Sequence, residues 1–298
     1  MQKITVTKDG SGDFLCIQDA IHSIRVHPLP PVTIFVKNGH YHERIHIPEN
    51  KPTISIIGES KEQTIITYDD HAHMLNDDGH SIGTFHTPTV NILSDQTIIK
   101  NVTIKNIAGR GENVGQALAL SVSGDQCYFE NVHLHGFQDT LYACKGNHYF
   151  EHCTIEGDID FIFGGAAALF YRCTIHSLRN GYITAASTPQ HQKFGFVFLH
   201  CKLTGEANQN SVYLGRPWRP WAHTLFIHCW MGEHIKQEGW NNWRDPKNEQ
   251  TARYGEFNSS GPGSALSKRV QWANEEIVIK EIETFHENLL KMKSNEPM

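Results

Sequence analysis

The chain has 298 residues, of which 39% are hydrophobic and 19% charged, and it carries a formal net charge of -6 at pH 7. This composition is typical of an ordered globular protein and argues against nucleic acid or an anionic membrane as the partner. No apolar run approaches the roughly 20 residues that cross a bilayer.

The N-terminal residues 1–6 enter strand-like alternation directly, without a signal peptide. We therefore expect a cytoplasmic protein, or a secreted one if a leader has been removed. The seven cysteines are an odd number, so they cannot all form disulfides within a monomer. No Cys-x-x-Cys motif is present, and we expect neither a metal nor a cofactor.

Helical spacing of apolar residues marks both ends of the chain. Residues 13–27 and residues 274–292 each show this spacing. We expect a short helix in each segment, placed as a cap on each end of the structure between them.

A strand-like unit recurs between the two ends. Each copy has an aromatic or aliphatic residue, a short spacer, then Asn or Cys, and soon afterwards a large apolar residue; the Asn or Cys lies at positions 101, 131, 153, 173, 201 and 229. Such a unit is too short to bury its own apolar face, so successive units must stack. The sequence therefore predicts an all-β fold, a right-handed parallel β-helix with short terminal helices, as a single domain over residues 1–298.

The Asn and Cys residues are predicted to form one internal column of this helix. Small buried cysteines are common in protein cores, so we interpret Cys153, Cys173, Cys201 and Cys229 as packing residues. A disulfide between Cys153 and Cys173, on adjacent turns, is the alternative in an oxidising compartment.

Several polar residues interrupt apolar stretches, where an unpaired charge is costly. They are Gln116, Gln138, Asp139, Asp158, Asp160 and Arg216. Asp139 lies eight residues after Asn131, and Asp160 lies seven after Cys153. Neighbouring turns are about 5 Å apart, so these two carboxyl groups are predicted to meet.

Two carboxyl groups at that distance do not both ionise easily, so one would be an acid and the other a nucleophile or base. The alternatives for single residues remain open. Either aspartate could belong to a turn, the glutamines to an amide ladder, and Arg216 to a structural ion pair.

At this point the chain resembles the pectin methylesterase family of carbohydrate esterases. The resemblance extends over roughly residues 5–275 and rests on an ordered set of motifs. These are Gly39-His40-Tyr41-His42-Glu43, Gln116-Ala117-Leu118-Ala119-Leu120, Gln138-Asp139-Thr140-Leu141, Asp160-Phe161-Ile162-Phe163-Gly164 and Leu214-Gly215-Arg216-Pro217-Trp218.

The resemblance implies a role for each matching residue. Asp160 would attack the methyl ester, and Asp139 would act as acid and then as base. Gln116 and Gln138 would stabilise the oxyanion, and Arg216 would keep Asp160 ionised. Substrate contacts are expected from Trp218, Thr84 and Phe161. The implied partner is methyl-esterified homogalacturonan or an oligogalacturonide, bound by a monomer.

Three other functions remain open. A polysaccharide lyase or glycosidase on the same scaffold could use the two aspartates for glycosidic cleavage. A binding protein without catalysis could use the tryptophans at positions 218, 221, 240 and 243. An esterase or thioesterase of the same family could act on another acyl group.

Overall fold

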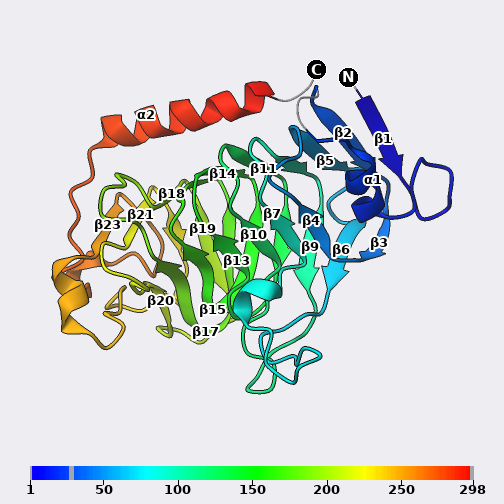
Figure 1. Cartoon of the computed structure of the whole chain (residues 1–298). Helices are drawn as coiled ribbons and strands as arrows, with labels where there is room; N and C mark the ends of the chain where they lie inside the picture. The colour runs from blue at the N-terminus through cyan, green and yellow to red at the C-terminus, as the bar shows by residue number, and fades with distance from the viewer. Residues whose placement is uncertain (1, 27–29, 296–298) are drawn as a thin grey trace.

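Two long ladders of parallel strands build the structure, a computed structural model that describes residues 2–26 and 30–295. The first is a ten-stranded sheet, seen along the top of the solenoid in Figure 1. In spatial order its strands are β1 (Gln2–Val6), β2 (Val32–Val36), β5 (Ile54–Gly58), β8 (Ile98–Lys100), β11 (Cys127–Glu130), β14 (Asn147–Glu151), β16 (Ala167–Tyr171), β18 (Phe196–Leu199), β21 (His223–Ile227) and β23 (Arg253–Phe257). The predicted parallel β-helix is confirmed.

The second sheet has thirteen strands and covers the other faces of the solenoid. One set of its strands comprises β3 (Gly39–His42), β6 (Thr64–Tyr68), β9 (Thr103–Asn106), β12 (His133–His135), β19 (Lys202–Gly205) and β22 (Trp230–Met231). The other set comprises β4 (Ile45–Ile47), β7 (Val90–Ile92), β10 (Leu120–Val122), β13 (Leu141–Ala143) and β20 (Val212–Gly215). The long strands β15 (Thr154–Gly164) and β17 (Thr174–Ala186) belong to both sets.

Strands β15 and β17 turn a corner between the two sets. The first half of β15 pairs with β12, with Thr154 opposite His133, whereas its second half pairs with β13, with Ile162 opposite Leu141. The register between β15 and β17 shifts in between, from Gly157 to Ile162. Asp160 lies at this corner.

The interior is filled by columns of identical side chains, because parallel strands in register bring equivalent residues of successive turns together. One column stacks five phenylalanine rings with centroids 4.4 to 4.9 Å apart: Phe129, Phe150, Phe170, Phe198 and Phe226. A second column consists of buried cysteines: Cys153, Cys173, Cys201 and Cys229.

The prediction of a single Asn and Cys column is wrong by one residue. The register of successive turns places the cysteines in line with Val102 and Val132. Asn101 and Asn131 belong to the preceding column, in which every residue has a left-handed backbone with φ of 53° to 56°: Asn101, Asn131, His152, Arg172, His200 and His228. Asn tolerates this conformation better than most residues, which explains its recurrence at the turn.

The disulfide expected as an alternative is also wrong. All seven cysteines are unpaired. The Sγ atoms of the column approach backbone carbonyl oxygens of the preceding turn instead, as Cys201 does with Phe170 O at 3.2 Å. The interpretation of the four cysteines as core packing is therefore confirmed.

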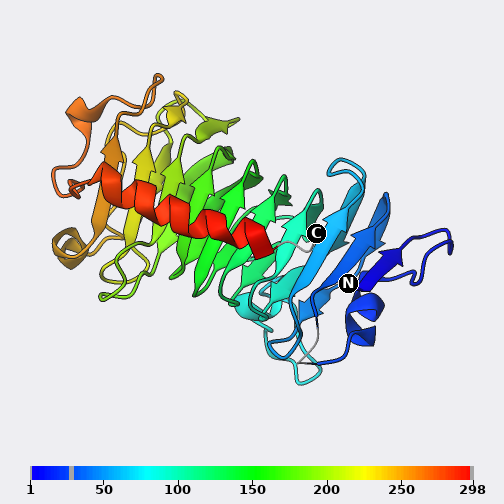
Figure 2. The same cartoon turned by 90° about the horizontal axis from the view of Figure 1, so that it is seen from above.

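Both predicted helices are present, but only one is a cap. Helix α1 (Ile17–Ser23) lies within the segment predicted as helical, whose last residue, 27, is outside the described residues. It packs against β1, β2 and β4 at the N-terminal end of the solenoid. Helix α2 (Ile279–Leu290) instead runs along the outer side of the ten-stranded sheet (Figure 2), so the predicted C-terminal cap is wrong.

The outer face of the ten-stranded sheet is apolar where α2 lies. Ile282, Phe285 and Leu289 of the helix pack in one cluster with Tyr149 and Leu169 of the sheet. Burial of these side chains against the sheet, not closure of an end, decides the position of the helix. Short 3₁₀ segments complete the described chain: η1 (Thr84–His86), η2 (Pro246–Gln250), η3 (Leu266–Lys268) and η4 (Lys291–Asn295). Among the described residues, no helix is both long and apolar enough to span a bilayer.

Candidate active site

Asp139 and Asp160 occupy equivalent positions on adjacent turns. With the corrected register, each lies seven residues after its column residue, Val132 or Cys153. The backbone N–H of Asp139 donates to the carbonyl of Ile159 at 3.1 Å, and both aspartates have left-handed backbones, with φ of 66° and 51°. This uncommon conformation occurs between β12 and β13 for Asp139 and at the corner of β15 for Asp160, and both side chains line the same cleft.

Arg216 holds the carboxylate of Asp160 through two parallel hydrogen bonds. Its Nε donates to Oδ1 at 2.9 Å and its Nη2 donates to Oδ2 at 2.6 Å. The guanidinium is itself clamped between the rings of Tyr182 and Trp243, each with its centroid 3.8 Å away. A planar fork fixed in this way orients a carboxylate, which the point charge of lysine cannot do.

The two carboxyl groups differ in acidity. Burial raises the pKa of Asp139 well above its ordinary value, and the charge of Asp160 raises it further against an opposing effect of Arg216. Burial also raises the pKa of Asp160, but the hydrogen bonds and charge of Arg216 counteract that rise. Asp139 therefore keeps its proton while Asp160 is the carboxylate of the pair.

Gln116 and Gln138 lie next to each other across two turns. Ala117 N, directly after Gln116, donates to the backbone carbonyl of Gln138 at 3.2 Å. Both glutamines line the same cleft as the two aspartates. Neither side-chain amide bonds to another group in the described part of the chain, so both are free to donate to a ligand.

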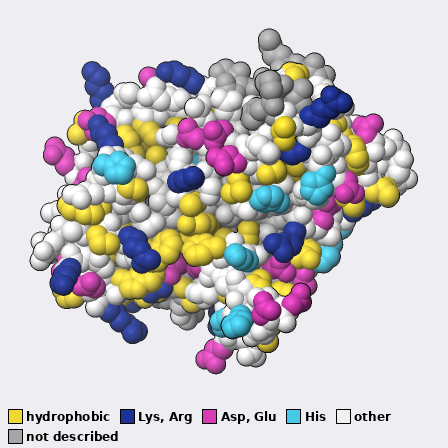
Figure 3. All heavy atoms as spheres, in the orientation of Figure 1, with side chains coloured by type: hydrophobic (Ala, Val, Ile, Leu, Met, Phe, Trp, Pro, Cys, Tyr) yellow, Lys and Arg dark blue, Asp and Glu magenta, His cyan; other side chains and the backbone are white. Residues whose placement is uncertain are grey.

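The cleft has a volume of about 310 Å³ and combines these polar groups with aromatic rings. It is lined by Thr84, Phe85, Gln116, Gln138, Asp139, Asp160, Phe163, Ala185, Arg216, Trp218 and Trp243. Tyr142 adds to the aromatic wall, since its ring stacks on Phe163 with centroids 4.6 Å apart and lies 5.1 Å from Phe85. Figure 3 shows apolar side chains gathered on the face of β10, β13 and β15, with cationic side chains beside them.

A larger cleft of about 790 Å³ continues from the first and shares Gln116 and Gln138 with it. Its walls carry the cations Arg110 and Arg179 together with the acidic residues Glu112 and Asp158. A smaller hollow shares Arg216 and Trp243 with the central cleft. The central cleft therefore adjoins one hollow at its two glutamines and another at Arg216 and Trp243, and we call the three together the groove.

Most of the site residues expected from the sequence come together in this cleft. Asp139, Asp160, the two glutamines and Arg216 all line it, and so do Trp218 and Thr84. The expectation for Phe161 is corrected, because its side chain is fully buried in the core. The left-handed residue Asp160 interrupts the alternation of the strand, so Phe161 and Ile162 both point inward and Phe163 faces the cleft.

Sequence reasoning missed several residues of the groove. Phe163 lay within a quoted motif but was not selected, and Phe85, Tyr142 and Arg179 carried no local signal. Trp243 was considered only as part of an aromatic binding surface with Trp240, which is in fact a core residue with 1% exposure. The clamp of Trp243 on Arg216 depends on contacts between distant turns, so no spacing in the sequence indicates it.

Comparisons with known proteins identify the family to which the chain is similar. The family model described as Pectinesterase matches residues 3–290. The curated relative Pectinesterase 31 of Arabidopsis thaliana is 38% identical over 277 residues, covering 91% of this chain and 87% of its own. The solved structure of the pectin methylesterase from carrot is 28% identical, with a TM-score of 0.89 over 100% of this chain and 97% of that chain. A pectin methylesterase in complex with a hexasaccharide is 30% identical, with a TM-score of 0.83 over 97% of each chain.

Proposed function

The chain belongs to the pectinesterase family of carboxylic ester hydrolases, and on that basis we propose that its cleft cleaves C6 methyl esters of galacturonate with Asp160 as nucleophile. The observation that carries the proposal is the pair of unequal aspartates. Asp160 is an oriented carboxylate held by Arg216, and Asp139 beside it is an acid held protonated by burial.

The first half of the reaction releases methanol. A carboxylate oxygen of Asp160 attacks the ester carbonyl carbon, and the carbonyl oxygen becomes a tetrahedral oxyanion. The amides of Gln116 and Gln138 donate hydrogen bonds to that oxyanion. As the carbon–oxygen bond to the methoxy group breaks, Asp139 gives its proton to the leaving group, and an acyl–enzyme anhydride remains on Asp160.

The second half regenerates the enzyme. Asp139, now a carboxylate, takes a proton from a water molecule that attacks the acyl carbon of the anhydride. The bond between the acyl carbon and the Asp160 oxygen breaks, which leaves a free galacturonate carboxyl group. Asp160 returns to its carboxylate form and Asp139 to its protonated form.

We further propose methyl-esterified homogalacturonan or its oligomers as the substrate, bound by a monomer. The groove continues beyond the central cleft that holds the aspartate pair, as a polymer chain requires, and a related enzyme is known in complex with a hexasaccharide. The rings of Trp218 and Phe163 suit the faces of sugar rings, and Arg110 and Arg179 suit carboxylates already freed of methyl groups.

Methanol release from methylated pectin by the wild type and by Asp160→Asn tests the proposal. We expect the variant to lose at least about a thousandfold in rate, since removal of a nucleophile typically costs that much or more. The matched control is Asp70→Asn, a comparably buried aspartate that pairs with Arg44 and lines none of the three hollows, and it should keep activity within about tenfold.

Turnover by Asp160→Asn at the wild-type rate would contradict the assignment of the nucleophile. New reducing ends or unsaturated products from the wild type, in place of methanol, would identify a glycosidase or lyase. Pectin binding without methanol release would identify a protein that only binds.

A further inference from the structure

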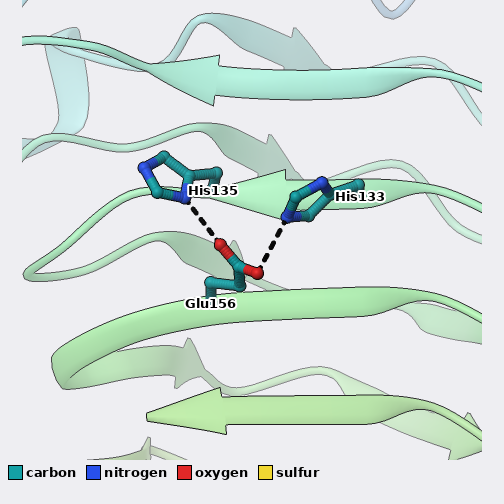
Figure 4. A group of neighbouring side chains, drawn as sticks. All are labelled: His133, His135 and Glu156. Carbon is teal, nitrogen blue, oxygen red and sulfur yellow. Dashed lines mark hydrogen bonds and ion pairs between the residues drawn. The ribbon is translucent and has the colours of Figure 1, made fainter. Parts of the chain in front are cut away.

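Two histidines and a glutamate meet on the outside of the solenoid, away from the cleft. His133 and His135 alternate with the buried Leu134 on β12, so both imidazoles point outward. Glu156 lies on the adjacent strand β15, directly opposite His135. Figure 4 shows its carboxylate between the two rings.

The three side chains present ligand atoms close together. Glu156 Oε2 lies 2.7 Å from His135 Nδ1, and its Oε1 lies 3.2 Å from His133 Nε2. Ligand atoms of all three residues fall within 4.8 Å of one another. Two ligand atoms of a tetrahedral Zn²⁺ ion, each about 2.0–2.2 Å from the ion, are about 3.3 Å apart. Small rotations of these three side chains are therefore enough to place their ligand atoms around a Zn²⁺ ion.

One of these atoms lacks a satisfactory partner. His133 Nε2 is buried and makes no hydrogen bond of good geometry, although a carboxylate oxygen is near. The side chains are 24%, 28% and 20% exposed for His133, His135 and Glu156, which leaves a route for an ion and for water as a further ligand. Two imidazoles with one carboxylate and an open position form a common transition-metal site.

We propose that His133, His135 and Glu156 bind one divalent transition-metal ion of the Zn²⁺ class. Nitrogen ligands favour such ions over Ca²⁺ and Mg²⁺, which prefer a shell of oxygen atoms. Lys105 faces His135 from β9, and His176 faces Glu156 from β17. The lysine opposes the cation, whereas His176 shares a hydrogen bond with the hydroxyl of Thr204 at 2.8 Å.

The position of the site gives it a structural role. His135 precedes Asp139 by four residues and Glu156 precedes Asp160 by four, so the ion would tie together the two turns that carry the aspartate pair. None of the three residues lines the cleft. The ion is therefore assigned to stability and not to ester hydrolysis.

The site is tested by thermal unfolding of the full chain. Metal is first removed with a chelator, and Tm is then measured as Zn²⁺ is added back. An ion that binds only the folded state raises Tm in proportion to the logarithm of its concentration above Kd. We expect one equivalent of Zn²⁺ by calorimetric titration, and a visible ligand-field spectrum with Co²⁺. His135→Ala and Glu156→Gln should each weaken Zn²⁺ binding by at least about 100-fold.

His228→Ala is the matched control, because His228 stacks on His200 with centroids 5.1 Å apart and the pair has no carboxylate between its rings. It should keep the full response to Zn²⁺. Methanol release is measured for each variant, to check that the variant is folded. If Zn²⁺ does not raise the Tm of the wild type, the proposal is overturned and the three residues are a hydrogen-bonded cluster only. The same conclusion follows if the His133→Ala/His135→Ala variant responds to Zn²⁺ as strongly as the wild type does. It also follows if Ca²⁺ raises the Tm of the wild type as much as Zn²⁺ does.

Discussion

Asp139 and Asp160 are the same amino acid placed in different surroundings. Of the two aspartates, Asp160 receives the hydrogen bonds of the Arg216 guanidinium, whereas Asp139 has the carboxylate of Asp160 as its neighbour. This asymmetry supports the proposed roles of Asp139 as the acid and Asp160 as the nucleophile. The roles of Gln138 and Asp139 lead to two separate measurements.

Replacement of Gln138 by alanine should raise the barrier for methyl ester hydrolysis by about 2.7–4 kcal/mol, because loss of one oxyanion donor has that effect in other hydrolases. The loss should appear in kcat, about 100- to 1000-fold, with KM little changed. Gln237→Ala, an exposed glutamine that does not line the cleft, serves as the control. Full activity of Gln138→Ala would remove this residue from the mechanism.

The raised pKa of Asp139 predicts how stability depends on pH. The folded protein keeps a proton that the unfolded chain has lost, so its stability falls as pH rises from the ordinary pKa of aspartate to the raised one, by at most about 1.4 kcal/mol per pH unit. Asp139→Asn removes this fall. In urea unfolding across this pH range, the variant should therefore become progressively more stable than the wild type.

Asp9 provides a control of opposite sign. Hydrogen bonds from Ser11 and Thr7 lower its pKa to about 2. It therefore stabilises the folded state above the ordinary pKa, and this contribution is lost as pH falls. Asp9→Asn should be less stable than the wild type at neutral pH, with the difference vanishing in acid. A pH-independent effect of Asp139→Asn would mean that Asp139 is ionised in the folded protein.

Strands β15 and β17 are the elements that make the site. Each passes from one set of strands to the next, and the left-handed residue at the corner of β15 directs its side chain outward from an otherwise buried segment. The aromatic and cysteine columns beneath them keep successive turns in register. The aromatic column therefore supports the geometry of the aspartate pair as well as the stability of the fold.

Truncation of one ring in this column should be costly. Phe170 is fully buried between Phe150 and Phe198, with centroids 4.9 and 4.5 Å away. Phe170→Ala should lower the free energy of unfolding by about 3–5 kcal/mol. Phe257→Ala, at a ring that is 40% exposed, should change it by only about 0.5 kcal/mol. Equal losses in urea unfolding would show that the column is not the source of stability.

At the scale of the whole molecule, the groove consists of the central cleft and the two hollows that share residues with it. One hollow is lined by Arg110 and Arg179, and the other lies beside Trp243. The protein is acidic, with a net charge of -6, so these local cations are needed to hold an anionic polymer.

Arg179→Ala should raise KM for long, partly de-esterified substrates by about 10- to 100-fold, the effect of one hydrogen bond to a charged group. The value of kcat should stay within about twofold, because the contact is the same in the ground state and the transition state. Oligomers too short to reach Arg179 should show no change. Arg172→Ala, at an exposed arginine outside the groove, is the control; equal effects on long and short substrates would exclude a binding role for Arg179.

Much of this protein can be predicted from the order of its residues. The parallel β-helix follows from short repeated units, because periodicity and burial are local properties of a strand. The set of two aspartates, two glutamines and one arginine follows from polar residues within apolar stretches, where burial demands a partner.

Contacts between distant parts of the chain set the rest. Packing between turns decides three features: the one-residue difference between the Asn and Cys columns, the inward turn of Phe161 and the position of α2 along the sheet. The same holds for the clamp of Tyr182 and Trp243 on Arg216 and for the meeting of His133, His135 and Glu156. A sequence specifies which side chains alternate, but the three-dimensional stacking of the turns determines which of them share a face.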